Sequence, residues 1–268
     1  IMQITGRQGI FDEPSHITAE YDVPTSAWFF NGADDGRLPV SILLEIALQP
    51  CGVLTGWLGT QLRFPKINYY FRNLDGDVKL LKNVSLQGKT VKTFATLTRT
   101  VFSGTIIIQH FEITLTVNGT PILQGTSSFG YFPEKTMASQ VGLDGGKSSR
   151  PWGLDPKNSA GELQTPSSET HFYPDCPTGR LKLIDKVKLS LLGGKYGKGY
   201  SVASRKNSPE DWFYTNHFYQ DPVMPGSLGI ESVLQAFKTL AQAKINSDGT
   251  FILAAVSYTH LTLPTKRI

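Results

Sequence analysis

The amino-acid sequence predicts an α+β fold made of two related units, each a helix packed against its own antiparallel sheet. Two mostly apolar segments, residues 38–58 and 225–243, are typical of buried helices. Residues 93–131 alternate apolar and polar side chains with a period of two, as strands do. The two apolar segments also share the spacing of their polar residues, which indicates an internal duplication.

The composition is that of a folded chain with one large domain or two ordinary ones. The chain has 268 residues, of which 40% are hydrophobic and 18% are charged, so a disordered chain is excluded. Its net charge of +4 is small and no run of five like charges occurs, so we expect no nucleic-acid partner. Two cysteines, Cys51 and Cys176, cannot form a disulfide framework or a CxxC zinc site. No uninterrupted apolar run is long enough for a membrane span and no signal peptide is visible, so we expect a cytoplasmic protein.

The first predicted helix contains two prolines with different consequences. Pro39 suits the first turn, where the missing N–H would have no partner in any case. Pro50 has no N–H to offer to the carbonyl of Ile46, so we expect a kink there. The segment is apolar on every face, which predicts a helix that is buried all round.

An antiparallel meander is expected after this helix. Its predicted strands cover residues 93–101, 103–117 and 121–131. Asn118-Gly119 lies between the last two strands and is the sequence of a tight hairpin turn, because both residues tolerate a positive φ.

Changes in composition set the predicted domain boundaries. Residues 1–133 form the first unit, residues 134–178 are a linker rich in Gly, Ser and Pro, and residues 179–255 form an incomplete second unit. Residues 256–268 have no counterpart in the first unit, and we expect them to be a non-native tail. The elements expected in the second unit are a strand, or a short helix plus a strand, over 181–192, a glycine turn over 193–199, a strand over 200–204 and the helix over 225–243.

Two segments repeat one pattern of aromatic and polar residues. The anchors are Trp28-Phe29-Phe30, Pro39, Glu45 and Gln49 in the first copy, and Trp212-Phe213-Tyr214, Pro225, Glu231 and Gln235 in the second. The glutamate follows the proline by six residues and the glutamine follows the glutamate by four in both copies. Five residues after the tryptophan, the first copy has Ala33 and the second has His217, so the second copy alone carries a histidine there.

Glu45 is a candidate general acid. It lies between Ile42-Leu43-Leu44 and Ile46-Ala47-Leu48, and apolar surroundings raise the pKa of a carboxyl group. A glutamate that is neutral near pH 7 can donate a proton. The alternative is a carboxylate that faces solvent or a salt bridge.

His217 is a candidate general base. It lies in an aromatic segment that would lower the pKa of its imidazole and keep the ring neutral, although a structural histidine is the alternative. The segment runs into a helix start at Pro225-Gly226. Because glycine has no side chain, the Gly226 N–H can approach a ligand closely at the N-terminus of that helix.

Residues 217–231, His-Phe-Tyr-Gln-Asp-Pro-Val-Met-Pro-Gly-Ser-Leu-Gly-Ile-Glu, resemble the motif of the bacterial 3-hydroxydecanoyl-ACP dehydratases. That family has the hotdog fold, in which an antiparallel sheet wraps a long helix. The first copy, with Ala-Trp-Phe-Phe-Asn-Gly (27–32), Leu-Glu-Ile-Ala-Leu-Gln-Pro-Cys-Gly (44–52) and Phe-Arg-Asn-Leu-Asp-Gly (71–76), resembles the dehydratase region of polyunsaturated fatty acid synthases. The resemblance implies a tandem of two hotdogs, the second truncated at its C-terminus, in a fragment of a larger synthase.

The resemblance also implies an activity, a 3-hydroxyacyl-ACP dehydratase that eliminates water to give a 2-enoyl thioester, with or without isomerisation of the double bond. It pairs His217 of one hotdog with Glu45 of the other, and it leaves the reciprocal pair, Glu231 and Ala33, as an inactive pseudo-site. Gly226, Pro225 and Gln49 would bind the substrate. The Gly226 N–H would polarise the thioester carbonyl, and Gln49 would orient Glu45 or the hydroxyl group of the substrate.

Partners and cofactors follow from the same resemblance. The substrate would be carried on the phosphopantetheine of an acyl carrier protein, and neither a metal nor a redox cofactor is expected. Other synthase domains would be partners, and the resemblance allows a homodimer. Two alternatives stay open: a hotdog acyl-thioesterase, which would use the same tunnel with water, and a non-catalytic acyl-binding pseudodomain.

Overall fold

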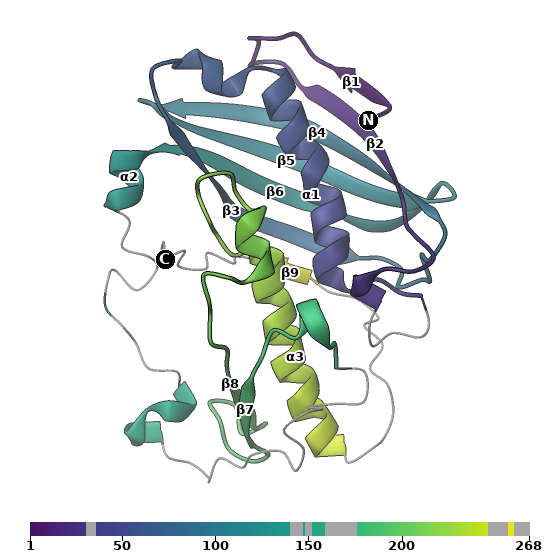
Figure 1. Ribbon diagram of the computed structural model, residues 1–268, viewed down its shortest axis with the longest axis vertical. Coiled ribbons are helices and arrows are strands. Elements are labelled where there is room, and N and C mark those ends of the chain that lie inside the picture. The colour runs from purple at the N-terminus through teal and green to yellow at the C-terminus, as the bar shows by residue number, and fades with distance from the viewer. Residues whose placement is uncertain (31–35, 140–146, 148–151, 159–175, 246–256, 260–268) are drawn as a thin grey trace. The chain divides into compact units, whose positions relative to one another are not determined.

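Contacts within the chain divide it into two compact units. The computed structural model in Figure 1 describes residues 1–30, 36–139, 147, 152–158, 176–245 and 257–259. Unit 1 consists of Ile1–Ala27, Asp35–Leu143 and Leu253–Pro264, and unit 2 consists of Trp28–Asp34, Asp144–Ile252 and Thr265–Ile268. The two units interleave along the chain, whereas the predicted domain boundaries at residues 133, 178 and 255 are sequential and stay predictions.

In unit 1, helix α1 (Val40–Trp57) lies across one face of an antiparallel sheet (Figure 1). The strand order is β1-β2-β4-β5-β6-β3-β9. The bounds are β1 Gln3–Thr5, β2 Ser15–Asp22, β3 Tyr69–Leu80, β4 Thr90–Ser103, β5 Ile106–Val117, β6 Thr120–Pro133 and β9 Ser257–Thr259. A long helix against an antiparallel sheet is the hotdog arrangement, and the predicted α+β class is confirmed.

The predicted meander is present as β4, β5 and β6, and side-chain alternation explains its burial. In β5 the buried residues are every second one, from Ile107 to Leu115, and they face α1. The predicted hairpin turn is confirmed, since Asn118 and Gly119 have φ values of 49° and 73°. Strand β3 was not predicted, because its Asn-Leu-Asp-Gly segment is poor in strand-forming residues, and a register shift between Asn73 and Asp75 interrupts its pairing with β6.

Helix α1 continues through Pro50, and a strand of the sheet supplies the hydrogen bond that this proline cannot make. The Thr93 hydroxyl on β4 donates to the Ile46 carbonyl over 3.3 Å. The prediction that this helix is buried on every face is wrong. Val53 and Trp57 are 43% and 46% exposed, so the sheet covers one face of the helix only.

Of the described residues, one helical stretch, Val40–Arg63, is long and apolar enough by length and composition to cross a membrane. It includes α1 and the 3₁₀ helix η2 (Thr60–Arg63). This is weak evidence for a span, because the core helix of a globular unit passes the same test, and 56% of its apolar window is buried.

In unit 2, helix α3 (Gly226–Ile245) packs on a two-stranded antiparallel sheet of β7 (Lys186–Ser190) and β8 (Tyr200–Ser204). The predicted short helix plus strand over 181–192 corresponds to the 3₁₀ helix η5 (Gly179–Leu181) and β7. The predicted glycine turn joins β7 to β8, and four of its glycines have φ values between 64° and 83°. Short elements also occur in the predicted linker, namely α2 Glu134–Ala138, η3 Trp152–Leu154 and η4 Pro156–Asn158.

The order of elements before each long helix repeats, which supports the predicted duplication. It is β1, β2, the 3₁₀ helix η1 (Trp28–Phe30) and α1 in the first copy, and β7, β8, the 3₁₀ helix η6 (Trp212–Thr215) and α3 in the second. After the helix, four long strands complete unit 1, whereas no strand of unit 2 follows α3 among the described residues. Residues 257–259 of the predicted tail form β9 beside β3 of unit 1.

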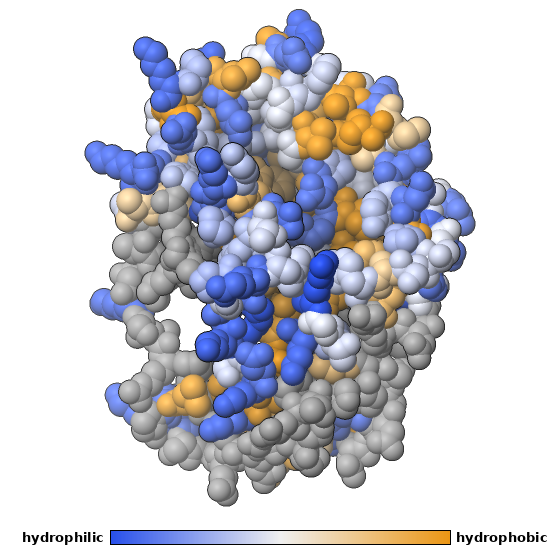
Figure 2. Space-filling view, in the orientation of Figure 1, coloured by the Kyte–Doolittle hydropathy of each residue, from blue (hydrophilic) through white to orange (hydrophobic). Residues whose placement is uncertain are grey.

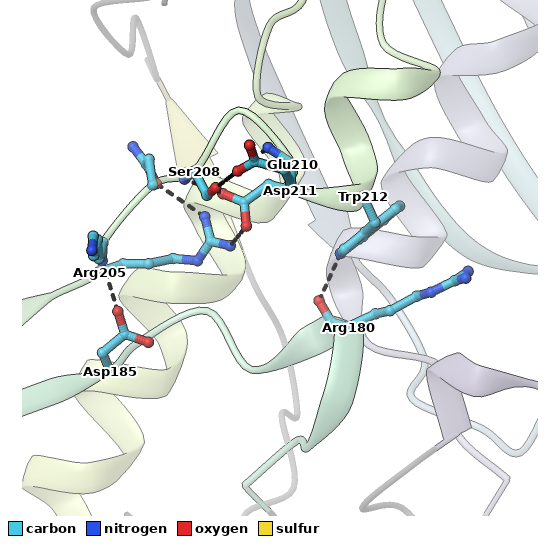
Figure 3. Close-up of polar contacts among 9 residues, drawn as sticks. Arg180, Asp185, Arg205, Ser208, Glu210, Asp211 and Trp212 are labelled. Atoms are coloured by element: carbon cyan, nitrogen blue, oxygen red, sulfur yellow. Dashed lines mark hydrogen bonds and ion pairs between the residues drawn. The ribbon is translucent and has the colours of Figure 1, made fainter.

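Residues of the repeat meet each other inside unit 2, which explains why Trp28 belongs to it. The Trp28 and Trp212 rings form an edge-to-face pair with centroids 5.1 Å apart. The Arg180 guanidinium lies 5.5 Å from the Trp28 ring and 5.8 Å from the Trp212 ring. The Trp212 indole N–H donates to the Arg180 carbonyl over 3.1 Å (Figure 3).

Hydrophobic patches interrupt an otherwise largely hydrophilic surface in Figure 2. Among the exposed hydrophobic side chains, Val233 and Phe237 of α3 are 60% and 61% exposed. The two-stranded sheet of unit 2 therefore leaves an apolar face of its helix uncovered.

Candidate active site

The His217 loop connects η6 to helix α3 and is closed by backbone hydrogen bonds. The His217 N–H donates to the Phe213 carbonyl over 3.0 Å, and the Val223 N–H donates to the His217 carbonyl over 2.8 Å. Within the loop, Phe218 and Asp221 exchange N–H to carbonyl bonds of 2.9 and 3.2 Å. Phe213 is 1% exposed, so the loop starts from a buried anchor.

The imidazole of His217 has a defined tautomer when it is neutral. Its Nδ1 lies 2.9 Å from the Val223 carbonyl oxygen. A carbonyl only accepts, so Nδ1 carries the proton and Nε2 keeps a lone pair. The ring also lies against Phe218, with centroids 3.7 Å apart and an angle of 32° between the planes. The half-buried ring is thus oriented with a nitrogen that can take up a proton.

Gly226 is the first residue of α3 and follows Pro225 directly, as predicted. The Pro225 carbonyl accepts the N–H groups of Leu228 and Gly229, at 3.1 and 3.4 Å. A Cβ added at Gly226 would meet no atom within 4 Å, so the space around this helix start is open. The N-terminus of a helix carries partial positive charge, and an N–H there suits an oxygen that gains negative charge.

Glu231 and Gln235, one turn apart on α3, are buried and hydrogen-bonded. Glu231 is 4% exposed and Gln235 is 0% exposed. The Gln235 amide donates to the Leu181 carbonyl over 2.8 Å and to Glu231 Oε1 over 3.2 Å, and its oxygen accepts the Leu183 N–H over 3.1 Å. Gln235 therefore fastens α3 to the segment that leads into β7.

The counterparts in unit 1 are more accessible. Glu45 is half-buried on α1 and Gln49 is exposed. Ala33 lies outside the described residues. His217 and Glu45 belong to different units, so their pairing across the two copies stays a prediction.

A hollow of about 400 Å³ in unit 1 contains none of the predicted site residues. It lies where the loop after β1 meets the C-terminal end of α1, and Trp57, Leu62 and Arg63 are among its lining residues. In the described part of the chain, no group of three or more His, Cys, Asp or Glu side chains could hold a metal ion.

Sequence reasoning missed a polar network that surrounds the start of η6 (Figure 3). Arg205 forms an ion pair with Asp211, Nη2 to Oδ1, at 2.8 Å. The available signal was the aspartate directly before Trp212, because aspartate is a favoured residue at a helix start.

Two comparisons find proteins that are similar to this chain, one over its C-terminal third and one over most of its length. Residues 176–260 match the model of the FabA-like domain. The chain is also 37% identical over 241 residues to a polyunsaturated fatty acid synthase subunit of Thraustochytrium sp.. That alignment covers 84% of this chain, which spans only 16% of the length of the relative. Both matches confirm the resemblance found in the motifs.

Solved structures give weaker likenesses. The dehydratase heterocomplex ApeI:P from Xenorhabdus doucetiae is 22% identical, with 50% of this chain and 82% of that chain covered and a TM-score of 0.36. An acyl-ACP thioesterase from Bacteroides thetaiotaomicron is 14% identical, with 45% and 47% covered and a TM-score of 0.34.

Proposed function

We propose that the chain is a dehydratase part of a fatty acid synthase of the polyunsaturated type. It would remove water from a 3-hydroxyacyl thioester and release a 2-enoyl thioester. The observation that carries the proposal is the fixed imidazole of His217, within the residues that match the FabA-like domain. The synthase subunit that resembles 84% of the chain supports the same assignment.

In the proposed reaction, two protons move and one C–O bond breaks. His217 Nε2 takes the proton from the carbon next to the thioester carbonyl. The Gly226 N–H donates to the carbonyl oxygen as negative charge develops there. Glu45 gives its proton to the hydroxyl group at the third carbon, which leaves as water. Each proton-transfer group would contribute a factor of about 10²–10⁴ to the rate.

Partner proteins and further residues of this chain would support the reaction. The acyl chain would arrive on the phosphopantetheine of an acyl carrier protein, in a cytoplasmic synthase whose other domains are partners. Gln49 would orient Glu45, and the two proton transfers would need neither a metal nor a redox cofactor. Glu231 would have a structural role in unit 2, because its carboxylate accepts a hydrogen bond from Gln235.

The test is an assay of the whole chain with 3-hydroxyacyl thioesters, with the products separated by mass. We expect a 2-enoyl thioester from the unmodified chain and a loss of at least about 10²-fold for His217→Ala and for Glu45→Gln, because each removes a proton-transfer group. Glu231→Gln is the matched control, since glutamine keeps the hydrogen bond to Gln235, and it should stay active.

Three outcomes contradict the proposal or a part of it. Release of a free acid would favour the thioesterase. Binding of the acyl thioester without any turnover would favour the pseudodomain. An inactive Glu231→Gln beside a fully active Glu45→Gln would show that the pairing across the two copies is wrong.

A further inference from the structure

We infer that Arg205 is a positioning residue for His217, because its guanidinium holds the 3₁₀ helix η6 from which the His217 loop starts. The inference rests on the proposed function for its effect on turnover. Its structural basis lies entirely within unit 2.

Arg205 first holds the N-terminal end of η6. Its Nη2 lies 2.8 Å from Oδ1 of Asp211, the residue directly before η6. The other carboxylate oxygen of Asp211 accepts the Ser208 N–H over 3.1 Å, and the Asp211 carbonyl accepts the Tyr214 N–H over 3.0 Å. Both charged side chains are 16% exposed, so solvent and salt screen this pair less than an exposed one.

Arg205 also contacts the middle of η6. Its guanidinium carbon lies 5.3 Å from the centroid of the Phe213 ring, within the range of a cation–π interaction. The Phe213 carbonyl is the acceptor of the His217 N–H. The Arg205 side chain thus contacts both Asp211, directly before η6, and Phe213, whose carbonyl accepts the His217 N–H.

The backbone next to Arg205 is held on the other side by Asp185, which directly precedes β7 (Figure 3). Arg205 directly follows β8, and the next N–H, that of Lys206, donates to Asp185 Oδ2 over 2.7 Å. Arg205 Nη1 donates to Asn207 Oδ1 over 3.0 Å. The contacts therefore run without a break from the sheet through Arg205 to η6 and His217.

An arginine suits this position better than a lysine. A planar guanidinium can pair with a carboxylate at its edge while its face lies over an aromatic ring, and an ammonium group is a point charge on a flexible stem. A displacement of about 1 Å at a catalytic group can cost about 10²-fold in rate. Arg205→Lys should therefore lower kcat by about 10–100-fold with little change in KM, since the substrate contacts stay in place.

The experiment compares Arg205→Lys and Asp211→Asn with Arg7→Lys in the whole chain. Arg7 is the matched control, because it forms an ion pair with Glu13 at 2.6 Å on the surface of unit 1, where the two side chains are 69% and 56% exposed. The measurements are kcat and KM with a 3-hydroxyacyl thioester, the ¹⁵N NMR signals of His217, and circular dichroism to establish that each variant is folded.

We expect Arg205→Lys and Asp211→Asn to mix the His217 tautomers and lower kcat, and the control to do neither. A folded Arg205→Lys chain with unchanged tautomer and unchanged kcat would overturn the inference. Because the NMR readout does not depend on turnover, a shifted tautomer in a chain without dehydratase activity would support the positioning role while the proposed function fails.

Discussion

Gln235 and Gln49 occupy the same position of the repeat and have different surroundings. The amide of Gln235 is 0% exposed and bonds to Leu181, Leu183 and Glu231, whereas Gln49 is exposed on α1. Sequence spacing placed both residues on the same helix face as a glutamate. It could not show that a loop from elsewhere in the chain covers one of them.

This difference predicts unequal effects on stability. Gln235→Leu should lower the free energy of unfolding by about 2–4 kcal/mol, because the Leu183 N–H and the Leu181 carbonyl lose the side chain to which they are hydrogen-bonded in a buried place. Gln49→Leu should change it by less than about 0.5 kcal/mol, as exposed positions do. Urea unfolding of both variants is the measurement, and equal losses would contradict the prediction.

The raised pKa of Tyr131 should make the folded protein less stable in alkaline solution. Burial raises the pKa of its phenol from 10.0 to about 12, although the hydrogen bond with Thr55, 2.5 Å between the hydroxyl oxygens, offsets part of the rise. The folded state therefore holds the proton more tightly than the unfolded state. The resulting stabilisation is complete below pH 10 and is lost as the pH rises through about 12.

The free energy of unfolding, measured against pH for the unmodified chain and Tyr131→Phe, tests this point. The unmodified chain should lose about 2–3 kcal/mol more than the variant between these pH values. Tyr219→Phe is the control, because Tyr219 is 88% exposed and should leave the pH dependence unchanged. A constant difference between the unmodified chain and Tyr131→Phe would show that the tyrosine does not titrate as expected.

At the scale of elements, α1 and β4 are coupled by the carbonyl that Pro50 leaves without an N–H. Thr93 is 2% exposed and its hydroxyl donates to that carbonyl, on Ile46. Thr93→Val should therefore lower the free energy of unfolding by about 1–3 kcal/mol, because the partly buried Ile46 carbonyl loses its donor.

Thr93→Val should cost less in a Pro50→Ala background, because the alanine has an N–H that can bond to the Ile46 carbonyl within the helix. A double-mutant cycle from chemical unfolding measures this coupling, for which we expect about 1 kcal/mol. Strictly additive losses would show that the threonine hydroxyl does not replace the missing donor.

At the scale of the whole molecule, the two units differ in how much of their helix is covered. Unit 1 has long strands against α1, whereas unit 2 has two five-residue strands against α3. Two-stranded sheets are marginally stable by themselves. The apolar face of α3 with Val233 and Phe237 is also exposed.

The rates of amide hydrogen exchange should therefore differ between the two units. We expect the amide protons of α1 to exchange more slowly than those of α3, because local opening needs less free energy where fewer apolar contacts are lost. Mass spectrometry of peptides from the two helices in one sample compares them directly. Equal protection would show that α3 has a cover that the described residues do not include.

Features that depend on residues close together along the chain could be predicted from the sequence. Long apolar segments predicted both long helices, and alternation with a period of two predicted the strands β4 to β6. The Asn118-Gly119 pair predicted the hairpin, and the 217–231 motif identified the histidine loop. These features depend on residues that are neighbours along the chain, so their pattern can be read without knowing the fold.

Contacts between residues far apart along the chain could not be predicted and are seen only in the folded protein. Thr93 lies against the carbonyl freed by Pro50, Gln235 fastens a loop more than fifty residues away, and Arg205 holds the helix that leads to His217. The same holds for β3, which joins the sheet beside β6, and for the face of α1 that stays exposed. Contacts of this kind depend on which surfaces pack together, and no local spacing of residues encodes that choice.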